Sequence, residues 1–455
     1  MNVNTNMLTE RVLNTPQNKL NIQRHIGRIN LAEKVQNKVG KTLSLEKKTA
    51  LATCLENTRQ ILESATNVSN IPSKTFFLDM ITSVVPNLIA SDLVSTQALD
   101  AKAGMISYLR FLYGTNKGQV TAGQMFTNSM YTGRSDANYT SRKVDGEIIA
   151  DGVSFDFTPV LPGTVEINND GAILKDDANG NIVNDLNAVV GTIDYATGTV
   201  DCDTLADGAS VTYEYNNEEL PLRNANGSTV PEISLELAQL PVYAKSRKLA
   251  AYWGLDAAYD LKNQNRQDIE KVISTQAAGE IAHEIDTEIC LDLYKKAGAG
   301  SEIRWSKTAP HGVTLMDHYD SFMITLTEGQ NAIYGATQRV RPNWIVCGLN
   351  VMSVIQNMRN FDGANTSKAV GPHMFGTLGG TYKCYVVPAM DPDAFLMGYK
   401  GTNFLETGYV YAPYMPLLTT DLLMPSDFRG QQGYATSYGL KMVNNKMYLR
   451  GRITE

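Results

Sequence analysis

The sequence predicts an α+β protein, and three observations support this. Over residues 8–68, apolar side chains recur every three or four positions among Gln, Glu, Lys and Arg, which is typical of amphipathic helices. Over residues 115–235, short alternating segments are separated by Asn- and Gly-containing turns, which is the pattern of β-hairpins. A continuous apolar stripe over residues 266–297 predicts one long helix.

The first helical region is expected to break at Pro16 and near Gly40, because proline and glycine interrupt helices. Helix is predicted to continue over residues 75–112, where Pro86 suits a first helical turn. Two apolar stripes in that stretch support the prediction: Phe76, Phe77 and Met80, then Leu88, Ile89 and Leu93.

The β region contains three predicted turns, at residues 169–171, 178–180 and 196–198, because Gly and Asn accept the positive φ that hairpins need. The strands are expected around residues 163–167, 191–195, 198–200 and 210–215. A loop this long with strands of its own is more typical of a functional extension than of a simple connection.

The helix predicted at residues 266–297 has an acidic line of Glu280, Glu284 and Glu288 beside its apolar stripe, and it would be about 45 Å long. Residues 300–455 then alternate strand-like and helix-like segments. Examples are a strand at 344–347 followed by a helix at 350–358, and two final strands, 438–443 and 447–449, around the turn Asn444-Asn445.

Length and composition indicate a folded chain of two to four units, with 455 residues of which 43% are hydrophobic. The sequence contains no run of 18 or more apolar residues, so no membrane span is predicted. The first residues lack the apolar core of a signal peptide. We therefore expect synthesis in a cytoplasm. The five cysteines have no CxxC spacing and are expected to be free thiols.

Charge is unevenly distributed along the chain. Residues 1–63 hold ten Lys plus Arg and five Glu, a balance of +5, whereas the remainder has 30 basic and 42 acidic residues, a balance of −12. The basic segment is either a solvated helical arm or a docking segment for an acidic partner, such as a scaffold core or nucleic acid. The acidic body argues against broad binding to DNA phosphates.

Motifs for catalysis are absent from the sequence: there is no phosphate-binding glycine loop and no GxSxG elbow, and the five histidines lie singly. His283-Glu284 begins like a zinc-protease helix, but Thr287 stands where the second histidine belongs. The groups Asp317-His318-Tyr319-Asp320 and Asp177, Asn179, Asn181 are interpreted as a solvated turn and a polar hairpin end. The sequence predicts no enzyme, no cofactor and no metal.

Three blocks carry a resemblance to a known family. The first is Val85-Pro86-Asn87-Leu88-Ile89-Ala90-Ser91-Asp92-Leu93-Val94, closed by residues 108–114; the second is the AKSR segment at residues 244–247, within 242–262; the third comprises residues 386–388, 397–401 and 408–417. In this order, the blocks resemble the T-even-type major capsid proteins of tailed bacteriophages.

The resemblance implies the tailed-phage major capsid fold, with an N-arm, an extended E-loop overlapping a neighbour, a P-domain with a spine helix, and an A-domain. It assigns a helical N-terminal arm to residues 1–70 and an N-arm to P-domain segment to 71–114. The E-loop with a β-rich insertion takes 115–235, the P-domain takes 236–300, and the A-domain with returning P-domain strands takes 301–455.

The implied function is self-assembly into the icosahedral or prolate head shell that encloses double-stranded DNA in the virion. The expected partners are, first, copies of the chain itself, in hexameric capsomers alone or in hexameric and pentameric capsomers. Portal, scaffold, and vertex or decoration proteins are expected as further partners. No membrane partner is expected. The alternatives are a vertex paralogue, an encapsulin-type shell protein or, from another class, a glycan-binding surface or tail protein.

Two sets of site residues are predicted. Lys245, Arg247 and Lys248 are expected to face carboxylates of an adjacent subunit's extended loop, because the sequence offers them no obvious partner within the chain. The family's prohead protease cuts after Ile or Leu, any residue, then Glu, so the resemblance makes the bond between Glu63 and Ser64 a candidate maturation site. Four other positions fit the same pattern.

Overall fold

The structure is a computed structural model that describes residues 13–38, 43–65, 88–124, 138–149, 154–202, 205–206, 208–218, 230–266, 268–337, 340–364, 371–401, 408–420 and 429–454. The chain divides into two compact units. Unit 1 comprises residues 1–108 and 239–455, and unit 2 comprises residues 109–238. No helix in the described ranges is long and apolar enough to cross a lipid bilayer.

Three helices begin the described chain and confirm the helical prediction there: α2 (Pro16–Arg24), α3 (Ile26–Lys38) and α4 (Leu45–Ala65). The Thr15 side chain caps α2 by accepting a hydrogen bond from the Asn18 amide at 3.3 Å. Pro16 follows in the first turn, where its missing N–H costs nothing. The region around Gly40 lies outside the described residues.

The helix predicted over residues 75–112 is wrong for most of its described part. Only α6 (Ala90–Leu93) is helical, and it is followed by β1 (Ser95–Thr96) and β2 (Ala103–Tyr113). Strand β2 pairs with β10 (Ile233–Tyr243), far along the chain, to form a two-stranded sheet. The alternation of exposed Met105 and buried Ile106 fits a strand, so long-range pairing overrode the apolar pattern. Residues 75–87 lie outside the described ranges.

A four-stranded sheet in unit 1 has the order β1-β18-β19-β11, with β18 at Tyr409–Thr419, β19 at Arg429–Met442 and β11 at Lys245–Gly254. Strand β11 pairs antiparallel with β19 along its whole length, in the register that sets Lys245 opposite Tyr438. The AKSR segment of the second motif block therefore lies largely on a strand.

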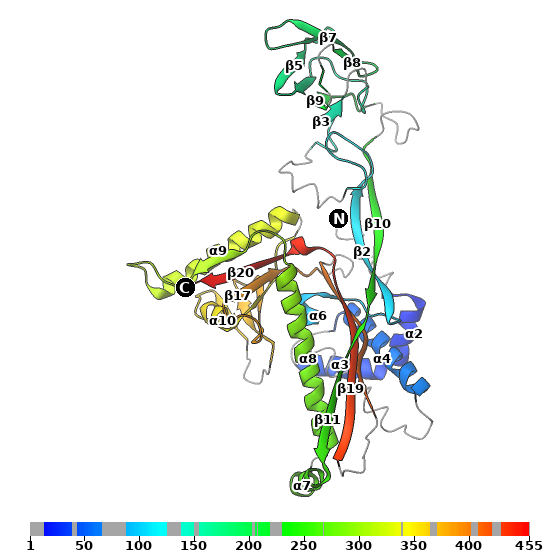
Figure 1. The fold of residues 1–455 in the computed structure, drawn as a ribbon, viewed down its shortest axis with the longest axis vertical. Helices are drawn as coiled ribbons and strands as arrows, with labels where there is room; N and C mark the ends of the chain where they lie inside the picture. Colours follow the sequence, from blue (N-terminus) through cyan, green and yellow to red (C-terminus); the bar gives the residue numbers. More distant parts are fainter. Residues whose placement is uncertain are drawn as a thin grey trace. The chain divides into compact units, whose positions relative to one another are not determined.

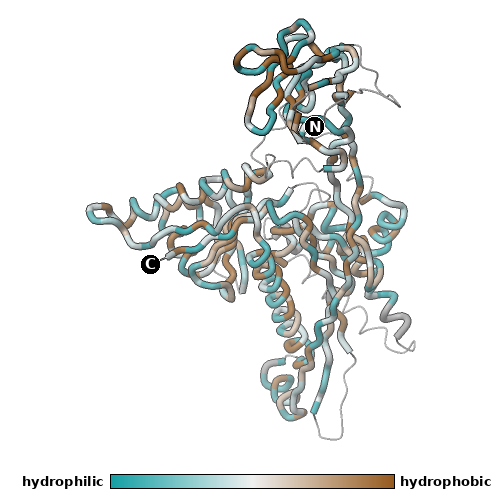
Figure 2. The backbone as a smooth tube through the Cα atoms, turned by 45° about the horizontal axis from the view of Figure 1, so that its top comes forward, coloured by the Kyte–Doolittle hydropathy of each residue, from teal (hydrophilic) through white to brown (hydrophobic). Residues whose placement is uncertain are grey.

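Helix α7 (Leu255–Asn265) follows β11 and ends at Arg266, whose φ is 54°. Helix α8 (Ile269–Lys296) then confirms the long helix predicted at 266–297, and its 28 residues span about 42 Å. Lys295 and Lys296 in its last turn complement the negative end of the helix dipole. Helix α8 packs along β11 and β19 (Figure 1), and hydrophobic and hydrophilic residues alternate along its coil (Figure 2).

A second, mixed sheet in unit 1 has the order β12-β20-β17-β13-β16-β15-β14. Its strands are β12 (Ile303–Ser306), β13 (Trp344–Cys347), β14 (Phe361–Gly363), β15 (His373–Leu378), β16 (Tyr382–Val386), β17 (Ala394–Gly398) and β20 (Tyr448–Thr454). The accompanying helices are α9 (Leu315–Thr337), α10 (Leu349–Gln356) and the 3-10 turn η3 (Asn445–Met447). The strand and helix predicted at 344–358 are confirmed.

The final two strands exist as predicted but are not partners across the turn at Asn444. Strand β19 belongs to the four-stranded sheet, whereas β20 lies between β12 and β17 in the seven-stranded sheet. Asn444 instead caps η3 by accepting from the Lys446 amide, and the chain passes from one sheet to the other.

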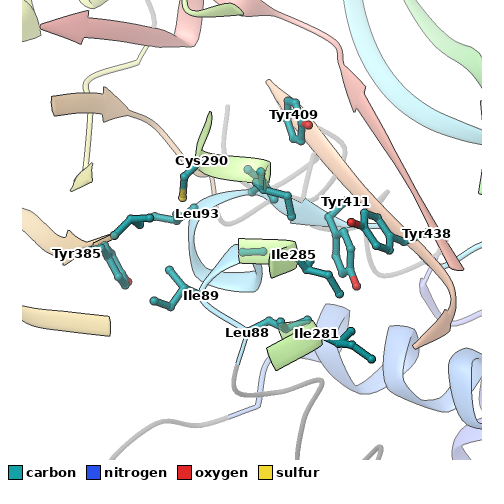
Figure 3. Packing of buried hydrophobic residues seen from close by; sticks show 14 of the residues in the cluster. Leu88, Ile89, Leu93, Ile281, Ile285, Cys290, Tyr385, Tyr409, Tyr411 and Tyr438 are labelled. Carbon is teal, nitrogen blue, oxygen red and sulfur yellow. The ribbon is translucent and has the colours of Figure 1, made fainter. Parts of the chain in front are cut away.

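The largest hydrophobic cluster of unit 1 joins segments that are distant in sequence. Figure 3 shows Leu88, Ile89 and Leu93 around α6 gathered with Ile281 and Ile285 of α8, and Tyr411 beside them. The same cluster contains residues of α3 and α4, among them Ile29, Ala32, Leu51 and Leu55. The N-terminal helices are therefore built into the core of unit 1.

Unit 2 contains a seven-stranded antiparallel sheet of order β3-β9-β4-β5-β6-β7-β8. The strands are β3 (Lys143–Ile149), β4 (Glu166–Asn169), β5 (Ala172–Asp176), β6 (Asn181–Val183), β7 (Val189–Asp194), β8 (Thr199–Cys202) and β9 (Ala209–Glu214). The three predicted turns are confirmed, with positive φ at Gly171, Gly180 and Gly198. Phe155 stacks on Tyr213 and Phe157 on Tyr215 in a core separate from that of unit 1.

Candidate inter-subunit surface

A mixed-charge groove of about 860 Å³ lies in unit 1 along α8 and the adjoining ends of β11 and β19. Its lining residues are Tyr243, Lys245, Ser246, Arg247, Glu280, His283, Glu284, Thr287, Glu288, Leu291, Asp292, Lys295, Lys296, Ala389, Tyr438, Gly439 and Leu440. The groove thus joins the predicted cationic block to the acidic line of α8.

Arg247 has a partner within its own chain, so one premise of the sequence prediction is wrong. Its guanidinium donates to Glu284 Oε2 and to Glu288 Oε2, each at 2.7 Å. The guanidinium also lies 5.8 Å from the ring centre of Tyr438, whose hydroxyl donates to Glu288. The sequence could not pair Arg247 with α8, because the helix begins more than twenty residues later and only the fold brings the two together.

Lys245 and Lys248 are exposed on β11, and neither forms an ion pair with another described residue. Lys245 lines the groove, whereas Lys248 does not. Of the three predicted cations, these two therefore keep their charge available to a second molecule.

Two polar atoms at the groove lack a hydrogen-bond partner among the described residues: His283 Nδ1 and Thr287 Oγ1. Both side chains project from α8, one turn apart. A buried polar atom without a partner costs free energy, but both atoms are covered by the chain itself, so the groove does not present them to a second molecule.

Unit 2 presents an apolar stripe that the sequence analysis missed. Ile233, Leu235 and Leu237 alternate on β10 and are 54%, 50% and 48% exposed. Alternate residues of a strand point to the same face, so the three side chains form one continuous stripe. The alternation of the sequence Ile-Ser-Leu-Glu-Leu is the signal that could have revealed it.

The candidate cleavage residues Glu63 and Ser64 lie within the C-terminal part of α4. The bond between them is therefore helical rather than extended. The buried part of α4, residues 49–58, ends before Glu63.

The candidate metal ligands have other partners. Asp317 pairs with Arg359, and His318 Nε2 lies 2.9 Å from the Ser306 carbonyl oxygen. Asp177 accepts hydrogen bonds from the Asn179 and Asn181 amides at the hairpin end between β5 and β6. No cluster of three or more His, Cys, Asp or Glu side chains suited to a metal occurs in the described ranges. All five cysteines are free and buried.

Comparison with known proteins places these features in a family. The family model described as Major capsid protein Gp23 matches residues 73–455. The chain is 25% identical over 397 residues to the major capsid protein of Enterobacteria phage T6, covering 80% of this chain and 76% of that protein. It is also 25% identical over 397 residues to that of Vibrio phage KVP40, with 80% and 75% covered. For Enterobacteria phage T4 the identity is 24% over 402 residues, with 80% and 74% covered.

Among solved structures, the capsid of Myoviridae phage XM1 aligns with a TM-score of 0.34 at 10% identity, covering 52% of this chain and 82% of that one. Mycobacterium phage Adephagia aligns with a TM-score of 0.35 at 9% identity, with 53% and 82% covered. The sequence match to the family model by itself spans most of the chain. The chain belongs to the Gp23 family of major capsid proteins, the subunits of the tailed-phage head shell.

Proposed function

We propose that the chain assembles into the head shell by burying the apolar stripe of β10 against a neighbouring copy. Ile233, Leu235 and Leu237 are half exposed on a two-stranded sheet, and such sheets are marginally stable in water when they stand alone. Because each side chain is already about half buried in one copy, covering the rest of it contributes about 1 kcal/mol. Because every copy carries the stripe, this contact would recur throughout the shell.

The groove along α8 is the second proposed contact. Lys245 and Lys248 would meet carboxylates of the neighbour's extended loop, and Arg247 would be shared between that loop and its own Glu284 and Glu288.

The same proposal includes the arrangement of the copies and the other proteins of the shell. Hexameric capsomers, alone or together with pentameric capsomers, would close an icosahedral or prolate shell around double-stranded DNA. The net charge of −7 favours enclosure without tight phosphate binding. Scaffold, portal, and vertex or decoration proteins would act during assembly, and cleavage between Glu63 and Ser64 stays a prediction. A structural role of this kind needs no catalytic site.

The test is a triple variant, Ile233→Ser, Leu235→Ser and Leu237→Ser, compared with wild type by electron microscopy and sedimentation. We expect particles to be lost while the chain stays folded by circular dichroism, since the stripe is solvent exposed within one copy. Ser234→Thr is the matched control, because Ser234 lies on the same strand between two stripe residues. Normal particles from the triple variant would contradict the proposed contact. Particles in which the wild-type chain occupies the five-fold vertices alone would contradict its proposed role throughout the shell.

A further inference from the structure

Helices α2, α3 and α4 form a coherent module, residues 13–65, held by its own polar contacts. The buried carboxylate of Glu56 on α4 accepts from Arg24 and His25, each at 3.0 Å, and from Arg59 at 2.7 Å. Lys48 on α4 pairs with Glu33 on α3 at 3.0 Å. These contacts join all three helices to one another without using any other part of the chain.

The module is seated in the core of unit 1. Every residue of α4 from 49 to 58 is buried, which amounts to almost three helical turns covered on all sides. On one side α4 packs against α2, and on another it packs against β18. Leu51 and Leu55 share one hydrophobic cluster with Leu93, Tyr411 and Leu417 of the remaining chain.

Three side chains of the module make four polar contacts with the rest of unit 1, and these contacts fix its orientation. Asn57 Nδ2 donates to the carbonyl oxygens of Leu99 at 2.8 Å and Tyr414 at 3.0 Å. Glu46 accepts from the Thr96 amide at 2.7 Å, and Lys47 pairs with Asp92 at 2.7 Å. On the module side these contacts come from residues between positions 46 and 57, so all of them precede Glu63.

We infer that residues 13–65 are a docked core layer of the shell subunit that stays bound when the chain is severed after it. A cut between Glu63 and Ser64 would leave every one of these docking contacts on the N-terminal fragment. Such a cut would therefore convert a covalent arm into a non-covalent ligand of the same subunit, without releasing it. The inference does not depend on shell assembly, since all the contacts lie within one copy.

The test is to introduce a specific protease site into residues 66–87 of the full chain and to cut the folded protein. We expect both fragments to co-elute in size exclusion and to appear as a 1:1 complex in native mass spectrometry. Elution of the N-terminal fragment by itself in non-denaturing buffer would overturn the inference. As a second arm, residues 1–65 carrying an affinity tag are co-expressed with residues 66–455, and the two are expected to purify together. A soluble, cooperatively folded 66–455 that fails to bind the tagged fragment would also overturn it.

Adjacent lysines provide a matched pair of variants. Lys47→Met removes the contact to Asp92 outside the module, whereas Lys48→Met removes the contact to Glu33 within the module. In the cut protein, we expect Lys47→Met to raise the dissociation constant of the fragments several-fold, and Asn57→Ala to raise it about tenfold or more, because two buried carbonyl groups lose their donor. Lys48→Met should leave the dissociation constant nearly unchanged. An equal loss of affinity between the fragments in all three variants would contradict the proposed docking contacts.

Discussion

Asp286 is a carboxylate buried in the middle of α8, where it accepts hydrogen bonds from the Ala90 amide at 2.9 Å and the Ile89 amide at 3.2 Å. Burial raises the pKa of Asp286 from 3.8 to about 7, and the charge of Asp92 adds to the rise, although the two amide donors oppose it. The residue therefore gains a proton at near-neutral pH at the point where α8 meets the segment around α6.

This pKa shift predicts a pH dependence of stability. Between about pH 4 and pH 7 the folded state holds a proton that the unfolded state has lost, so the free energy of unfolding should fall as the pH rises. The shift corresponds to about 4 kcal/mol across that window. Asp286→Asn, which mimics the protonated acid, should flatten the dependence when urea unfolding of the unassembled chain is compared at pH 5 and pH 8. Asp268→Asn is the control, and an unchanged slope in Asp286→Asn would refute the assignment.

Glu56 is a buried carboxylate with the opposite behaviour. Hydrogen bonding from Arg59, followed by His25 and the charges of Arg59 and Arg24, outweighs burial and lowers the pKa of Glu56 to about 2. Its contribution to stability is therefore present above about pH 4.5 and is lost as the pH falls towards 2. The two carboxylates act in different pH windows, because one faces cations and the other faces apolar side chains and a second acid.

At the scale of elements, Lys117 links the segment after β2 to residues 138–141, which lead into strand β3 of unit 2. Lys117 is only 4% exposed, and its amine donates to the carbonyl oxygens of Asn138 at 2.8 Å, Tyr139 at 3.0 Å and Ser141 at 2.5 Å. The amine also faces the rings of Phe157 and Tyr215. Burial lowers the pKa of Lys117 to about 8, against the charge of Asp145.

Lys117→Met keeps most of the side-chain volume but leaves three carbonyl groups without their donor. We expect a loss of about 2–4 kcal/mol in the stability of unit 2, since unsatisfied buried polar groups each cost about 1–3 kcal/mol. Hydrogen exchange should show faster exchange in β3 and β9 and little change in α8. Lys143→Met is the control, because Lys143 forms an exposed pair with Asp145 that is worth little. Equal exchange rates in Lys117→Met and wild type would contradict this role.

Elements differ in how far local sequence specifies them. Helix α8 and the hairpin turns at Gly171, Gly180 and Gly198 were predictable, because apolar spacing and positive-φ residues act within a few positions. Strand β2 was mistaken for helix, since its partner β10 lies more than a hundred residues away. Strands β19 and β20 were found, but the turn between them did not reveal that they enter different sheets.

At the scale of the whole molecule, self-assembly turns weak surface contacts into a shell. An exposed ion pair contributes only about 0.2–1 kcal/mol, but a contact repeated in every copy acts many times over. Changing the charge of the exposed residues Lys245 and Lys248 is therefore a sensitive test of the proposed contact with a neighbour.

The double variant Lys245→Glu and Lys248→Glu leaves the contacts of Arg247 with α8 intact. We expect the protein concentration needed for particle formation to rise several-fold, because like charges would meet the neighbour's carboxylates. Light scattering against concentration, with electron microscopy of the products, measures this. Lys307→Glu, a charge reversal at an exposed residue outside the groove, should assemble normally. Unchanged assembly of the double variant would exclude these two lysines from the contact.

The sequence by itself determined the family, the α+β class, the long helix and the hairpin turns, since motif blocks, apolar periods and turn residues are local properties of the chain. Only the tertiary structure decided that Arg247 is bound by Glu284 and Glu288 and that α4 is enclosed within the core. Both outcomes depend on which distant segments meet. An ion pair or a buried helix face is set by its surroundings in space, and those surroundings exist only after the chain has folded.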